Sequence, residues 1–392
     1  VRPDPAEQGQ LYLGTARGVA WSPDDVATWT PLKHNLPTVA VHDLQVKDHD
    51  LVVGTHGRSI WILDDLTPLR EWTTAVESRP VHLFPVRPAT RWSYHRGISA
   101  HLRGPGENPP AGALVYYWLK EAPGADVVIE ILDGDGAVIR RLTSKKTESD
   151  FDETDPDPDR RLRPPEPLSA EPGVRGAVWD LRYEGARQIA VAEIDFGDPY
   201  TGPLVLPGTY SVRLTVGDEA ATTPLEVRPD PRVQTPRADM EEQLAFALTM
   251  RDDLTRIAEI VAGVRAVRER VAARAELLEG NAAAAELLAE ATALAGKLDA
   301  LESKLHNPEA RVNYDILGGR KGGVKLHSKL SPLYSWAHNG DGAPTQPVRE
   351  IYGRLAGELE ALDAEWAAIL ETDLPALNAK ARGLDLEFVP PP

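Results

Sequence analysis

The feature that most constrains the fold is an internal repeat at an offset of 40 residues near the start of the chain. A run with Leu, Gly and Thr at fixed places, followed by Trp, occurs twice: Leu11-Tyr12-Leu13-Gly14-Thr15 with Trp21, and Leu51-Val52-Val53-Gly54-Thr55 with Trp61. Each copy predicts two alternating strands joined by a turn that contains Gly and Arg, and residues 41–47 predict a further strand. Such a period with several short strands is typical of β-propeller blades, although a chance pair of hairpins would give the same pattern.

A second motif lies between the two copies. Ser22, Asp24, Thr28 and Trp29 match the Asp-box pattern S-x-D-x-G-x-T-W, with Val26 at the glycine position. In such a turn the Ser and Asp side chains hydrogen-bond the backbone, and the Trp is buried between blades. Because the glycine serves a position with positive φ, Val26 predicts a distorted turn. The motif is a structural device, and it indicates a fold rather than an activity.

On these motifs, and on the run V-V-G-T-H-G-R-S-I-W-I-L-D-D at 52–65, the chain resembles the last blades of bacterial BNR or Asp-box repeat proteins. These are sialidase-like and sortilin-like propeller proteins of the glycosyl hydrolase type. The resemblance implies blades followed by a β-sandwich and helices, an extracytoplasmic (periplasmic or secreted) location, and a carbohydrate or a protein as ligand. A propeller needs at least four blades, and residues 1–72 hold about one and a half. We therefore expect them to be the terminal blades of a longer propeller, whose N-terminal blades are missing here together with any signal peptide.

The middle of the chain, 73–234, predicts an Ig-like or fibronectin-like β-sandwich. Alternating segments between 113 and 227 are separated by turn signals such as D-G-D-G at 133–136. An acidic stretch at 150–159 has the alternating carboxylates of a Ca²⁺ loop. It lacks a glycine for the tight turn, and arginines follow it directly, so a solvated loop is the preferred interpretation.

The last part, 235–392, predicts an antiparallel three-helix bundle with a long insert at 307–346. One helix has heptad spacing, which leaves dimerisation through the helices as an alternative: Leu287, Ala291, Leu294, Leu298, Leu301 and Leu305. Within the insert, the basic glycine loop at 318–325 does not match a phosphate-binding P-loop, although it could hold an anion. His327 and His338 have no third ligand nearby in the sequence, so no metal site is predicted. The overall expectation is a multidomain fold of β followed by α.

Composition excludes several classes of function. The chain has no Cys, which removes thiol nucleophiles, disulfides and Cys-ligated metals. Lys and Arg total 43 against 60 Asp and Glu, a net charge of −17. Such a charge repels phosphate backbones and anionic lipid, so nucleic acid and membrane surfaces are not expected as partners. No apolar run is long enough to span a membrane, and no cofactor motif such as G-x-G-x-x-G occurs.

The candidate residues for chemistry lie at the ends of the last predicted strand of the repeat. His56 and Arg58 lie in its leading turn and Asp64 and Asp65 follow it, while Asp43 is a further single carboxylate. A glycosidase needs two carboxylates across the scissile bond, and these residues do not complete such a set, so the catalytic residues stay unknown. Two hypotheses remain open. One is a glycoside-hydrolase-like propeller protein that acts on or binds carbohydrate, and the other is a non-catalytic sortilin-like scaffold that binds a protein or peptide.

Overall fold

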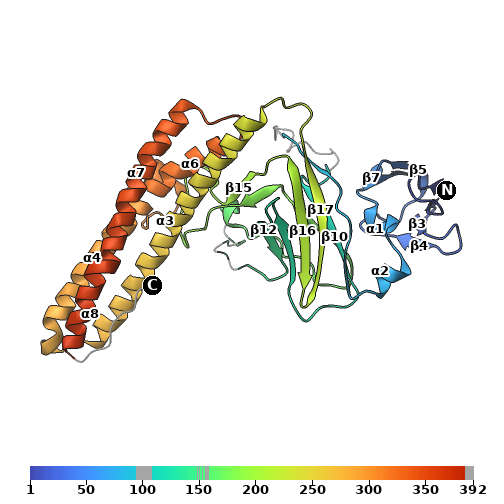
Figure 1. Cartoon of the computed structure of the whole chain (residues 1–392). Coiled ribbons are helices and arrows are strands. Elements are labelled where there is room, and N and C mark those ends of the chain that lie inside the picture. The colour runs from blue at the N-terminus through green and yellow to red at the C-terminus, as the bar shows by residue number, and fades with distance from the viewer. Residues whose placement is uncertain (94–107, 148, 150, 152, 155–158, 385–392) are drawn as a thin grey trace. The chain divides into compact units, whose positions relative to one another are not determined.

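The computed structural model describes residues 1–93, 108–147, 149, 151, 153–154 and 159–384. It is 36% helical and 25% strand, with a curled half-barrel sheet and a helical C-terminal region, which confirms the coarse prediction of β followed by α (Figure 1). Most of the predicted acidic loop at 150–159 lies outside the described residues. Among the described residues, the helices are too short or too polar to cross a bilayer.

The chain forms two compact units from interleaved segments. Unit 1 comprises Val1–Thr147, Pro165–Leu181 and Pro207–Val233, and unit 2 comprises Glu148–Pro164, Arg182–Leu206 and Gln234–Pro392. Residues 1–72 and most of 73–234 therefore belong to the same unit.

Unit 1 begins with two small antiparallel sheets. The first has the order β1-β2-β3-β4 and the second β5-β6-β7. Their strands are β1 (Arg2–Pro3), β2 (Leu11–Thr15), β3 (Gly18–Ser22), β4 (Thr30–Leu32), β5 (Val41–Lys47), β6 (Asp50–Thr55) and β7 (Ile60–Leu63). The two copies of the sequence repeat are the hairpins β2-β3 and β6-β7.

The two repeat hairpins differ by one residue in their turns, and this changes which side chains share a face. In the first copy Trp21 pairs with Tyr12, whereas in the second Trp61 pairs with Val53 and Ile62 pairs with Val52. A shift of one residue moves every side chain of a strand to the other face. The matching tryptophans of the sequence repeat therefore do not occupy matching places in the two sheets.

The rest of unit 1 contains two larger sheets, of order β13-β10-β8 and β12-β11-β16-β17-β9. The strands are β8 (Val81–Leu83), β9 (Ala89–Arg91), β10 (Ala113–Leu119), β11 (Val127–Leu132), β12 (Val138–Thr143), β13 (Gly173–Trp179), β16 (Gly208–Val216) and β17 (Glu219–Pro229), preceded by α1 (Thr67–Arg70) and α2 (Thr74–Ser78). In β10 and β16 alternate side chains are buried, and the rings of Trp179 and Tyr210 meet edge to face across the two sheets, 5.7 Å apart.

Unit 2 contains the long helices and a small sheet of β14 (Arg182–Glu184) and β15 (Thr201–Leu204). Its helices are η2 (Arg160–Leu162), α3 (Arg237–Leu277), η3 (Ala282–Ala284), α4 (Ala285–Leu305), α5 (Asn313–Leu317), α6 (Leu326–His338), α7 (Gln346–Ala368), the π-helical turn η4 (Ile369–Asp373) and α8 (Leu374–Gly383). The helices α3, α4, α6, α7 and α8 share one hydrophobic core. The heptad residues of α4 are all buried within the unit, so a dimer through the helices stays a prediction that would need another face.

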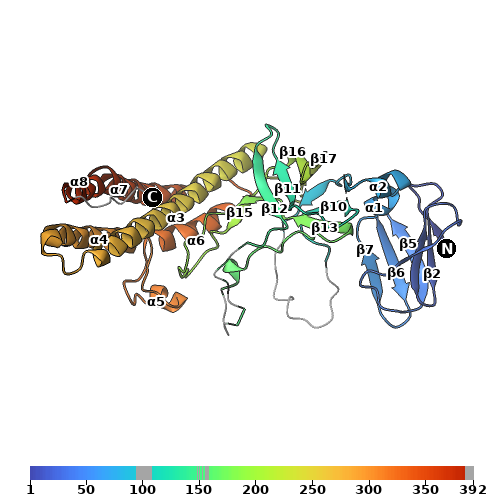
Figure 2. The ribbon, with the colours of Figure 1, turned by 90° about the horizontal axis from the view of Figure 1, so that it is seen from below.

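The predicted insert at 307–346 contains two helices, α5 and α6, joined by irregular segments. Its helix α6 runs beside α3 (Figure 2) and buries Leu326, Leu330 and Tyr334 completely. Two features of the sequence explain why α6 was not predicted as a helix. Pro332 lies inside it, and a proline normally ends a helical pattern because it lacks the backbone N–H. The preceding glycine loop also indicates irregular structure rather than a helix.

Candidate functional site

Ser22 is the last residue of β3, and the other three Asp-box residues lie in the connection from β3 to β4. The Asp24 carboxylate accepts hydrogen bonds from the Ser22 hydroxyl (3.0 Å) and from the Thr28 amide and hydroxyl (2.7 and 2.6 Å). The two bonds from Thr28 lower the pKa of Asp24 below its usual range. Ser22 is fully buried, and its hydroxyl oxygen also accepts a bond from the amide of Val26. Trp29 is half-buried. The side chains thus hold the turn closed, and no reactive group is presented.

Val26 adopts a left-handed backbone conformation, with φ of 70°, and the neighbouring Asp25 has φ of 51°. A β-branched residue is strained there because its side chain crowds the backbone, and only glycine adopts this region freely. The valine side chain is 57% exposed, so little packing offsets the strain.

Val26→Gly is therefore expected to raise the free energy of unfolding of unit 1 by about 0.5–1 kcal/mol. The relief of left-handed strain, about 1–2 kcal/mol, exceeds the extra flexibility that glycine gives the unfolded chain. Urea unfolding followed by tryptophan fluorescence measures the change. Ala27→Gly, one residue further at a position without positive φ, is the matched control and should lose stability. A loss in both variants would show that the turn carries no strain.

The four candidate residues for chemistry around β7 do not form one site. His56 and Arg58 lie exposed in the turn before β7, while Asp64 and Asp65 follow its end. The four residues of β7 separate the two pairs by about 13 Å, at roughly 3.3 Å per residue.

The two carboxylates after β7 have different surroundings. Asp65 is buried, and its carboxylate accepts hydrogen bonds from the amide and hydroxyl of Thr67 (3.0 and 2.6 Å), which holds the turn that leads into α1. Asp64 is half-buried, and this burial, followed by the charge of Asp50, raises the pKa of its carboxyl. Arg87 lies 3.3 Å from Asp50 and 3.9 Å from Asp65 and balances part of this charge. The arrangement is that of a structural turn before α1.

A polar pocket lies where the first strands of the two small sheets meet, and it collects residues that are distant in the sequence. It is open to solvent and is lined by Val1, Arg2, Gly14, Val41, His42, Asp43 and Leu44. The Arg2 guanidinium donates to Asp43 (2.8 Å) and to the carbonyl of Leu44 (2.8 Å). The imidazole ring of His42 lies 4.8 Å from that of His56. The single carboxylate Asp43 is thus brought together with Arg2 and His42, which the sequence analysis missed. The predicted candidate His56 contacts His42 but is not among the residues that line the pocket.

The signal for these missed residues lies in the strand order. The first strand of each sheet, β1 and β5, lies at the same edge, and the two strands are in contact. Residues at the start of each repeat unit therefore converge. Arg2 belongs to a two-residue strand, too short to be recognised from an alternating pattern.

A buried network beside this pocket is structural. Asp4 is an acceptor for both the Arg70 guanidinium (3.0 Å from Nε and from Nη2) and the Tyr12 hydroxyl (2.9 Å). The side chains of Arg70 and Asp4 are 7% and 0% exposed. This network ties the loop between β1 and β2 to helix α1.

In unit 2, the basic glycine loop at 318–325 leads into α6. The Lys321 ammonium pairs with Asp315 (2.8 Å), and Asn307 donates to the carbonyl of Gly323 (3.0 Å). His327 and His338 are both buried in α6. Across the described part of the chain, no three His, Asp or Glu side chains are arranged to hold a metal ion.

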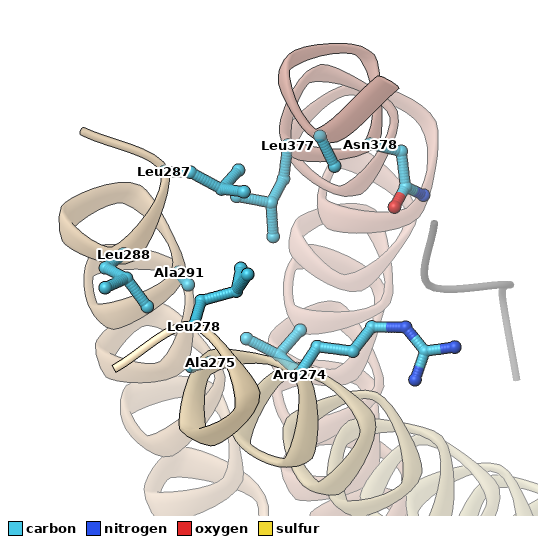
Figure 3. A pocket seen from close by; sticks show the side chains of 10 residues that line it. Arg274, Ala275, Leu278, Leu287, Leu288, Ala291, Leu377 and Asn378 are labelled. Atoms are coloured by element: carbon cyan, nitrogen blue, oxygen red, sulfur yellow. The ribbon is translucent and has the colours of Figure 1, made fainter. Parts of the chain in front are cut away.

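A further pocket, which lies in unit 2, is apolar. It lies where the end of α3 meets α4 and α8, and it is lined mainly by Leu and Ala side chains (Figure 3). Arg274 and Asn378 are its polar lining residues. It offers no nucleophile or carboxylate, and so it cannot support hydrolysis.

Comparison of the chain with protein-family models, with curated proteins and with solved structures finds no match.

Proposed function

We propose that this chain is the C-terminal part of a secreted propeller protein that binds carbohydrate at the pocket formed by Arg2, His42 and Asp43. In this proposal the two small sheets are terminal blades, the larger sheets are an Ig-like sandwich, and the helices are an antiparallel bundle with an accessory role. The support for blades is the contact between β1 and β5, which brings the first strands of successive sheets to one edge.

The observation that carries the binding proposal is the chemistry of the pocket. A guanidinium, a carboxylate and the imidazole of His42 supply donors and acceptors to one open space, and such groups can hydrogen-bond the hydroxyl groups of a sugar. The Arg2–Asp43 pair is half exposed on the arginine side and more exposed on the aspartate side, so a ligand can reach both. Asp43 is the single carboxylate that lines the pocket, whereas hydrolysis needs two. Binding is therefore the better-supported activity of these residues, and a second carboxylate would come from another blade.

The test uses the full chain with lactose and sialyllactose, titrated calorimetrically. We expect one of the two to bind, and Asp43→Ala to weaken that binding by roughly tenfold or more, the effect of one lost hydrogen bond to a charged group. Asp48→Ala, an exposed aspartate in the turn after β5, is the matched control and should bind as the parent does. Absence of binding, or equal binding by both variants, would overturn the proposal and favour the protein-binding scaffold.

A further inference from the structure

The apolar pocket of unit 2 has its polar side chains on one side. Figure 3 shows Arg274 of α3 and Asn378 of α8 on one side of the space. Leu287 and Leu288 of α4 lie on the opposite side. The other lining residues are apolar as well: Val271, Ala275, Leu278, Ala291, Leu377 and Ala381. Sites for small ligands have this composition, with mostly apolar walls and a few polar groups that orient the ligand.

The two polar side chains suit an anionic group of a ligand. The guanidinium of Arg274 is half-buried, and a guanidinium can donate two parallel hydrogen bonds to one carboxylate. Asn378 is only 9% exposed, although burying an amide costs free energy that an apolar side chain would not cost. An amide carries two N–H donors, so it can serve a ligand in addition to the protein. The polar side of the pocket therefore favours a carboxylate.

The π-helical turn η4 directs α8 towards this pocket. The buried stripe of α7 recurs at spacings of three and four: Leu355, Leu359, Leu362, Trp366 and Ile369. The next buried residue is Leu374, five positions after Ile369, whereas a continuous α-helix would turn Asp373 inward. The extra residue thus brings Leu377 and Asn378 to the pocket. Such π-turns are rare and occur frequently at functional sites.

Ion pairs hold α8 and the preceding turn against α4. Lys380 of α8 pairs with Glu286 (2.6 Å) and with Glu290, and Lys297 of α4 pairs with Asp373 of η4 (2.7 Å). Glu286 and Glu290 each precede a lining residue of the pocket. The ammonium of Lys380 offsets their charge, which would otherwise repel an anion. The pocket is therefore held in shape by its own helices and can accept a negative ligand.

We propose that this pocket binds a single-chain amphipathic carboxylate of the medium-chain fatty-acid type. The carboxylate pairs with Arg274 and Asn378, and the alkyl chain lies against the leucine side chains of α3, α4 and α8. Burial of that chain supplies most of the affinity, and the guanidinium supplies the preference for an acid. All the lining residues belong to unit 2, so the proposal is independent of the carbohydrate pocket of unit 1.

The test titrates the full chain calorimetrically with hexanoate, octanoate and 1-octanol, each below its micelle or solubility limit. We expect octanoate to bind about fifteenfold more tightly than hexanoate, since each of the two extra buried methylenes contributes about fourfold. Arg274→Met should weaken octanoate binding by roughly tenfold or more and leave 1-octanol binding unchanged. Arg382→Met, at an exposed arginine of α8 outside the lining set, is the matched control and should bind as the parent does.

A second variant fills the pocket without removing a charge. Ala275 is half-buried in the lining, so Ala275→Phe should abolish binding of both octanoate and 1-octanol. Ala273→Phe is its matched control, because Ala273 is exposed on the same helix and does not line the pocket. Far-UV circular dichroism of each variant checks that it is folded.

Three results would overturn the proposal. The first is a parent that binds neither octanoate nor 1-octanol, and the second is octanoate binding that Arg274→Met leaves unchanged. The third is octanoate binding that persists in Ala275→Phe, which would place the ligand elsewhere. Sugar binding that depends on Asp43 would be unaffected by any of these results, so the two proposals fail separately.

Discussion

Replacing Arg70 by leucine is expected to lower the free energy of unfolding of unit 1 by about 3–5 kcal/mol, the effect of breaking a buried ion pair on one side. The Asp4 side chain is completely buried, and Arg70 donates to both of its oxygens. Burial alone would raise the pKa of Asp4, but the hydrogen bonds from Arg70, the amide of Ala6 and Tyr12 outweigh it and hold that pKa below its usual range. Without Arg70 a desolvated carboxylate remains with too few donors.

The measurement is urea unfolding followed by tryptophan fluorescence, since seven of the nine tryptophans lie in unit 1. Arg228→Leu is the matched control, because Arg228 pairs with Glu226 at the surface with both side chains more than half exposed. Such a surface pair contributes little to stability, because water and salt screen it. The double variant Asp4→Asn with Arg70→Leu should regain part of the loss, since no charge is then buried. Equal small losses for Arg70→Leu and Arg228→Leu would show that the buried pair adds nothing.

Unit 2 is expected to lose stability steeply as the pH falls below about 6.5, the ordinary pKa of histidine. Burial, with the nearby His306 and Arg161 adding to it, lowers the pKa of His327 to about 3, and burial lowers that of His338 to about 4. At pH values between these lowered pKa values and 6.5, the two histidines are protonated in the unfolded chain but neutral in the folded chain. Stability is therefore complete above pH 6.5 and falls by about 1.4 kcal/mol per pH unit for each histidine.

Glu302 reinforces this loss at lower pH. Burial opposes its ionisation, but His306, Arg265 and Arg268 outweigh burial and lower its pKa to about 2. A carboxyl with a lowered pKa stabilises the fold above its unfolded value of 4.5, and this contribution is lost as the pH falls towards 2. The two histidines therefore dominate the window above pH 4.5, and the glutamate contributes below it.

The test is urea unfolding of unit 2, followed by far-UV circular dichroism at a series of pH values. His327→Leu should flatten the acid slope between pH 6.5 and 4.5 by about one half, because one of two buried histidines is removed. Leu330→Ala, a core change in the same helix, is the control: it should lower stability equally at every pH. A slope in His327→Leu as steep as in the parent would contradict the expected role of His327.

Parts of this fold follow from local patterns, and other parts do not. The heptad leucines of α4 predict a buried stripe, and Leu298, Leu301 and Leu305 are completely buried. The one-residue shift between the repeat hairpins was not predictable from the matching tryptophans, because the pairing depends on the length of the turn. It decides that Ile60 and Ile62, rather than Trp61, face outward.

The candidate site was less predictable than the fold. Arg2 and His42 are forty positions apart and share no motif, and only the meeting of β1 with β5 brings them to one pocket. The Asp-box residues, by contrast, form a local turn whose hydrogen bonds span at most four residues. Local hydrogen bonding can be inferred from spacing, whereas convergence of separate strands requires the register.

The interleaving of the two units has a consequence for biosynthesis. The chain passes between them at 147/148, 164/165, 181/182, 206/207 and 233/234. Because β9 pairs with β17, unit 1 cannot close until residues 227–229 have left the ribosome, and by then two segments of unit 2 have already emerged without their helices. This chain therefore cannot complete the folding of one domain before synthesis of the next domain begins, which is the usual order during translation. A nascent chain halted just after Val233 would expose Ile189 to solvent and to chaperones, since this residue is buried in the core that the later helices form.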